Sequence, residues 1–165
     1  MAADDSGFPS VLAGMWHGTG VPARVYDRLV VRRPNGKWQE KVEAEAAELA
    51  NGSLSPDRAY ASVLWPESLR VSTDAALAAF EDELHALVSS SDAKILGTVQ
   101  RLVVALNKIN DQHVRSGQTG YETDEREELC DYIDASLEES GIDVQALEAR
   151  HGIEHGEIAG QWRDW

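Results

Sequence analysis

The sequence predicts a predominantly α-helical domain of the α+β class, with its helices packed on one core and a minor β-hairpin or small sheet in the N-terminal third. Apolar residues recur at spacings of three and four from residue 77 onward, which is typical of amphipathic helices. Helix-capping residues stand at the ends of these segments. The hairpin is predicted because Leu29, Val30 and Val31 favour a strand and Pro34-Asn35-Gly36 supplies turn chemistry.

The N-terminal third is expected to combine this hairpin, near residues 26–39, with short helices and a further short strand near 68–72. The segment "EKVEAEAAELANG" is strongly helical and should end at Asn51-Gly52. Ser55 is the predicted N-cap of the next helix, with Pro56 at its first position. That helix should stop by Trp65 because a proline follows.

The remaining chain reads as three long helices and a short one. Thr73 is the predicted cap of the first, a second runs through Ile95 to Ile109, and Thr123 caps a third that ends at Gly141. Asp143 begins a short helix, Val144 to Arg150, and a short helix or turn should follow it. Because amphipathic helices cover one another's apolar faces, we expect eight residues to be buried together. They are Leu77, Phe80, Leu84, Leu102, Leu106, Leu129, Ile133 and Leu137.

Length and composition predict a single globular domain over residues 11–165, preceded by a flexible tail at 1–10. The 165 residues are 42% hydrophobic, which suffices for a core without disulfides, and Cys130 is the single cysteine. No signal peptide and no membrane-spanning apolar run is legible, so we expect a cytoplasmic protein without a membrane partner. The bias toward arginine and alanine suggests a bacterial source.

The net charge of −14 is unevenly distributed. Residues 1–119 carry 15 acidic and 12 basic residues, a net −3, whereas residues 120–165 carry 14 acidic and 3 basic residues, a net −11. Residues 24–41 run the other way, with six bases against two acids. An acidic balance repels phosphates, so nucleic acid is not an expected partner.

The predicted helix after Thr123 has a crowded acidic face opposite its apolar stripe. Such a face either keeps the protein soluble or docks a basic partner, whose encounter it would accelerate by electrostatic steering. We therefore predict a non-enzymatic, acidic protein-interaction or regulatory domain, and an immunity or antitoxin-like inhibitor of a basic partner is one concrete form of it. The partner and the oligomeric state are left open, and no cofactor is expected. The candidate partner-binding residues are Glu127, Glu128, Asp131, Asp134 and Glu138.

The alternative is a zinc-dependent hydrolase. His151, Glu154 and His155 form an H-x-x-E-H pattern, which on one helix places two ligands on one face with Glu154 as a general base. Gly152 and Gly156 weaken a helix there, and few residues remain to supply a third ligand. A helix that ends at Gly152 would separate the two histidines, so we favour a surface turn and assign no catalytic residue.

Trp162 and Trp165 need an account because they are large and stand in the final "QWRDW". We expect them to dock on the body of the protein as a lid over the core. The alternative is an exposed anchor for a partner.

Overall fold

The computed structural model describes residues 31–87 and 90–165, and in these ranges it contains helices and no strand. In chain order the elements are α1 (Pro34–Asn51), the 3₁₀ helix η1 (Pro56–Arg58), α2 (Ala61–Leu64), α3 (Glu67–Leu84), α4 (Asp92–Arg115), α5 (Thr123–Glu139) and α6 (Val144–His151). The prediction of a mainly helical protein is confirmed. The predicted tail at 1–10 lies outside the described residues.

The predicted hairpin is not seen, because α1 begins where its turn was expected. Pro34 occupies the first turn of α1, where its fixed φ suits a helix and its missing N–H costs nothing. Asn35 and Gly36 are helical too. The three residues therefore form the start of a helix rather than a turn. The strong helix formers that follow them favour this outcome. Residues 26–30 of the predicted strand lie outside the described ranges.

The predicted strand at 68–72 is also wrong, because α3 begins at Glu67, directly after Pro66. Thr73, the predicted N-cap, lies one and a half turns inside this helix and is fully buried. Its Oγ1 donates to the Leu69 carbonyl at 2.7 Å and lies 2.7 Å from the Tyr121 hydroxyl. The threonine hydroxyl is thus used to join α3 to the segment that precedes α5.

Most of the remaining helix boundaries agree with the sequence signals. Gly52 ends α1 in the left-handed conformation, with φ 78°. Ser55 precedes η1 and α2 ends before Pro66, but the single helix predicted between them is divided into η1 and α2. The predicted helix after Thr123 starts at that residue, but Glu122 is its N-cap, and the Glu122 N–H donates to Glu125 Oε2 at 3.0 Å.

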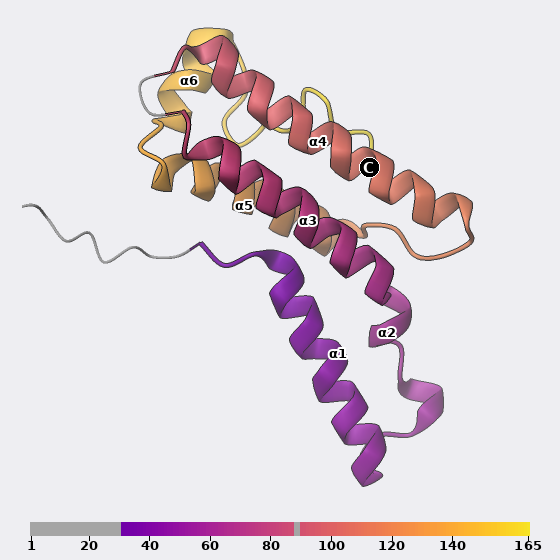
Figure 1. Cartoon of the computed structure of the whole chain (residues 1–165). Coiled ribbons are helices and arrows are strands. Elements are labelled where there is room, and N and C mark those ends of the chain that lie inside the picture. Colours follow the sequence, from indigo (N-terminus) through magenta and orange to yellow (C-terminus); the bar gives the residue numbers. More distant parts are fainter. Residues whose placement is uncertain (1–30, 88–89) are drawn as a thin grey trace, which may run out of the picture.

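The most extensive packing joins α3 to the neighbouring α4, and Figure 1 shows the two running side by side with α5 behind α3. Helix α1 contacts α3 and α5 near its start and α2 farther along, and its far end points away from α3, α4 and α5 in Figure 1. All eight predicted core residues are buried, so this prediction is confirmed. Within the described ranges, no helix is both long and apolar enough to span a membrane.

The end of the chain packs on the other helices beside α4 (Figure 1). Trp165 is buried, and its ring meets that of Tyr121 edge-on at 5.6 Å, while Tyr121 lies 6.2 Å from the buried Trp38. Trp162 is partly buried, and its carbonyl accepts a hydrogen bond from Asn107 Nδ2 at 2.8 Å. The expected docking of the terminal tryptophans is therefore observed, as turns rather than as a helix.

Candidate interaction surface on helix α5

Helix α5 presents one apolar side to the core and one acidic side to solvent. Leu129, Ile133 and Leu137 are fully buried. On the opposite side Glu127, Asp131 and Glu138 are exposed, and no hydrogen bond from another described residue reaches their carboxylates. Asp124, in the first turn, is exposed on the same side. At 100° per residue these four positions fall within about 60° of one another, so they form a single row. We call Asp124, Glu127, Asp131 and Glu138 the acidic row.

Glu128, a predicted member of this surface, turns toward α1 instead. Its Oε2 accepts a hydrogen bond from the Trp38 indole at 2.7 Å, and its Oε1 lies 3.5 Å from Lys37 Nζ. The Trp38 side chain is fully buried, so its N–H needs an acceptor. Glu128 therefore joins two helices and is not available as a docking group.

Asp134, the other predicted member that turns inward, is half-buried beside α6. The pKa of this carboxyl is raised to about 6, chiefly by burial and also by the nearby charges of Glu148, Glu138 and Asp131, while His155 acts in the opposite direction. Burial and neighbouring negative charges both favour the neutral form of a carboxyl. The five predicted residues thus divide into three that face solvent, one that bonds to α1 and one that is half-buried.

Two further carboxylates lie in the interior of the protein, and the sequence analysis did not predict a role for them. Glu125 is buried, and its Oε1 accepts a hydrogen bond from the Trp65 indole at 2.8 Å. Glu148 is buried on α6 and accepts the Gly156 N–H at 2.9 Å. The signal for Glu125 is its place three residues after the helix N-cap, where a glutamate can reach back to the backbone. No local pattern marks Glu148.

A second cluster of charges anchors the start of α1 to α3 and α5. Arg33 donates to Asp74 at 2.8 Å and to Glu81 at 2.6 and 2.8 Å, and Tyr132 of α5 also donates to Glu81. Hydrogen bonds from Asn35 and Arg33 hold the pKa of Asp74 below its usual range. The pKa of Glu81 is also lowered, chiefly by the hydrogen bonds from Arg33. Part of the positive charge of residues 24–41 is therefore already paired with carboxylates inside the protein.

The H-x-x-E-H pattern is split by the end of a helix. Helix α6 stops at His151, and Gly152 follows in the left-handed conformation with φ 66°. His151 Nε2 lies 3.0 Å from Asp92, whereas His155 Nδ1 lies 3.3 Å from Glu148. The predicted end of the helix at Gly152 is confirmed, and the two histidines lie beside different carboxylates. Across residues 31–87 and 90–165, no three His, Cys, Asp or Glu side chains are arranged to hold a metal ion. The geometry offers no support for the zinc alternative with Glu154 as its base.

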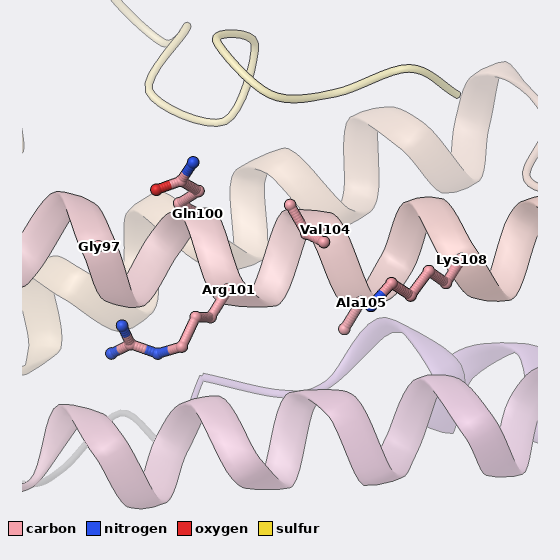
Figure 2. Close-up of a pocket in the computed structure, with 6 residues that line it drawn as sticks. All are labelled: Gly97, Gln100, Arg101, Val104, Ala105 and Lys108. Atoms are coloured by element: carbon pink, nitrogen blue, oxygen red, sulfur yellow. The ribbon is translucent and has the colours of Figure 1, made fainter.

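The outward side of α4 carries a shallow hollow with a basic rim (Figure 2). Figure 2 shows Arg101 extending toward α3, where its guanidinium bonds to Glu83 at 3.0 Å and to Thr98 at 2.9 Å. The charge most suited to bind a ligand here is therefore already engaged within the protein. The hollow is lined by Gly97, Gln100, Arg101, Val104, Ala105 and Lys108.

Neither a family model, nor a curated protein, nor a solved structure matches this chain. Function is therefore inferred from the surface and its chemistry.

Proposed function

We propose that this chain is a non-enzymatic protein-interaction domain that docks a basic protein on the acidic row of α5. The observation that carries the proposal is the exposure of Glu127, Asp131 and Glu138 together on one helix face, free of hydrogen bonds from other described residues. Surface carboxylates that form no ion pair within the described residues keep a negative potential that attracts a complementary partner.

The rigidity of α5 supports this proposal. The helix is fixed to α1 through Trp38 and Glu128, to the end of α2 through Trp65 and Glu125, and to the last turns of α3 through Tyr132 and Glu81. These contacts hold the acidic row in a fixed orientation before any partner arrives. A preorganised surface loses less conformational freedom on binding than a flexible acidic tail would.

An inhibitor of a basic effector, of the immunity or antitoxin type, is the form of this function that we favour. Such a protein gains from rapid encounter, which charge complementarity provides. The same negative potential disfavours nucleic acid as the direct partner. A cytoplasmic location belongs to the proposal as well, because the half-buried Cys130 suits a reducing compartment.

The test compares two triple variants that carry the same net charge. One neutralises the acidic row through Glu127→Gln, Asp131→Asn and Glu138→Gln; the matched control neutralises exposed acids of α1 and α3 through Glu43→Gln, Glu48→Gln and Asp82→Asn. Each protein is immobilised and offered extract from the source cells at low ionic strength, and retained basic proteins are identified by mass spectrometry. We expect one basic protein to be retained by the wild type and the control but lost from the row variant. Equal retention by both variants would contradict the proposal.

A further inference from the structure

A serine and a histidine meet where the start of α3 lies beside the end of α4. The two helices run side by side in opposite directions, so these two ends lie together in Figure 1. Ser68 Oγ lies 2.9 Å from His113 Nε2, and His113 Nδ1 lies 2.9 Å from the Ile109 carbonyl oxygen. Ser68 is exposed, whereas His113 is only 6% exposed. An accessible hydroxyl is thus held against a buried imidazole.

The Ile109 carbonyl fixes which nitrogen of His113 carries the hydrogen. A carbonyl oxygen only accepts, so Nδ1 is the donor in this bond. In the neutral imidazole the other nitrogen is then an acceptor, and the Ser68 hydroxyl donates to Nε2. A serine whose proton is directed at a histidine, while a third group orients that histidine, is the arrangement that activates a serine nucleophile. Here the Ile109 carbonyl is the third group.

The backbone around Ser68 favours the negative charge that a nucleophilic attack develops. Ser68 is the second residue of α3, and side chains of a helix lean toward its N-terminal end. The N–H groups of Glu67, Ser68 and Leu69 form no hydrogen bond with another described residue, because a helix leaves its first N–H groups without internal acceptors. Together with the helix dipole, such donors stabilise an oxyanion at this end of α3.

We propose that Ser68 is a nucleophilic serine, with His113 as its general base, that takes up an acyl group from an activated ester. Val71, one turn farther along α3, is 61% exposed and offers an apolar contact for the acyl chain beside the hydroxyl. One transfer per chain is a modification of the protein rather than turnover. It requires no partner on the acidic row and is therefore independent of the proposed docking function.

The transfer has two steps. Ser68 Oγ first forms a bond to the acyl carbon, the hydroxyl proton passes to His113 Nε2, and the former carbonyl oxygen becomes an oxyanion beside the N–H groups at the start of α3. The bond from the acyl carbon to the leaving oxygen then breaks, and that oxygen takes the proton from His113 Nε2. The products are an ester on Ser68, a free alcohol or phenol, and His113 in its original neutral form.

A fluorophosphonate probe tests the nucleophile on the intact chain. The probe forms an Oγ–P bond with an activated serine while its P–F bond breaks, and fluoride leaves with the hydroxyl proton. Peptide mass spectrometry compares the labelling rate of Ser68 with that of Ser62, which is exposed on α2 and has no histidine bonded to it among the described residues. Because a general base accelerates such attacks by about 100-fold or more, Ser68 should be labelled at least about 100-fold faster.

Acyl transfer itself is followed with p-nitrophenyl acetate. The wild type should gain one acetyl group on Ser68, with release of one nitrophenolate per chain in a fast first phase. Ser68→Ala should remove this phase, and the control Ser62→Ala should keep it. A fast phase of equal size in Ser68→Ala would overturn the proposal.

The variant His113→Gln separates a base from a structural contact. Glutamine can still donate to the Ile109 carbonyl and accept from Ser68, but it does not act as a base, so labelling of Ser68 should slow by about 100-fold in a protein that unfolds at a similar temperature. An unchanged rate in this folded variant would contradict the role of His113. The wild-type comparison decides the question even where the variant does not fold. If Ser68 reacts no faster than Ser62, the bond to His113 only joins α3 to α4, and the proposal is wrong.

Discussion

Helices α4 and α5 both present a charged side to solvent, but contacts among the described residues engage three of the four lysine and arginine side chains of α4 and none of the acidic row. Helix α4 carries a base every seven residues, at Lys94, Arg101, Lys108 and Arg115. Arg101 is bonded to Glu83 and Arg115 to Asp111, and Lys94 donates to the Ala86 carbonyl. The acidic row of α5 receives no such contact from the described residues. A surface charge is available to a partner only where no other residue of the protein already pairs with it.

Substitutions on the buried sides of the two helices should lower the stability of the protein by similar amounts. These are the largest effects that we expect. Leu106 of α4 and Leu129 of α5 are both fully buried. Truncating either to alanine should lower the free energy of unfolding by about 2–5 kcal/mol, because each leaves a cavity in the same core. Urea denaturation measures both values. A loss under about 0.5 kcal/mol for either would mean that its helix has been assigned the wrong inward face.

Substitutions of buried and of exposed carboxylates of α5 should differ clearly in their effect on the free energy of unfolding. Glu125→Ala leaves the buried Trp65 N–H without its acceptor and should cost about 1–3 kcal/mol. Glu127→Ala, two residues along the helix and exposed, should change stability by less than about 0.5 kcal/mol. Thermal unfolding of the pair gives the comparison. Similar losses in both variants would show that the exposed row also has a structural role.

The outward charges of α4 and α5 should give small effects of opposite sign. Arg101→Gln removes an exposed ion pair with Glu83 and should cost up to about 1 kcal/mol at low salt. Asp131→Asn relieves repulsion with Glu127, one turn away, and should gain a few tenths of a kcal/mol. Urea titrations at low and high salt measure both, and the difference should shrink as salt screens exposed charges. A stabilising Arg101→Gln would contradict the view that the charge of Arg101 is used in a contact with α3.

The sequence predicted the helical core well, because periodic apolar positions depend on local spacing alone. It failed where one signal had two meanings: Pro34-Asn35-Gly36 fits a turn as well as the first turn of a helix, and only the residues that follow decide. The prediction of a strand at 68–72 was wrong for a related reason. Pro66 directly precedes α3, and this helix includes residues 68–72.

The candidate surface was predictable in part. The spacing of Glu127, Asp131 and Glu138 places them opposite the apolar stripe, and they are exposed as expected. Glu128 and Asp134 differ because their neighbours come from elsewhere in the chain, Trp38 ninety residues earlier and Glu148 on the next helix. Pairings of this kind depend on the tertiary fold and leave no mark in the local pattern.

The most direct test of the account is the association rate of the captured basic partner, measured by stopped flow as ionic strength rises. The row variant (Glu127→Gln, Asp131→Asn, Glu138→Gln) is compared with the control of equal net charge (Glu43→Gln, Glu48→Gln, Asp82→Asn). We predict that the row variant slows association by about tenfold or more at low salt and flattens its salt dependence, with little change in dissociation. The control should retain most of the wild-type rate. If both variants slow association equally, overall charge and not the acidic row guides the partner, and the central claim is wrong.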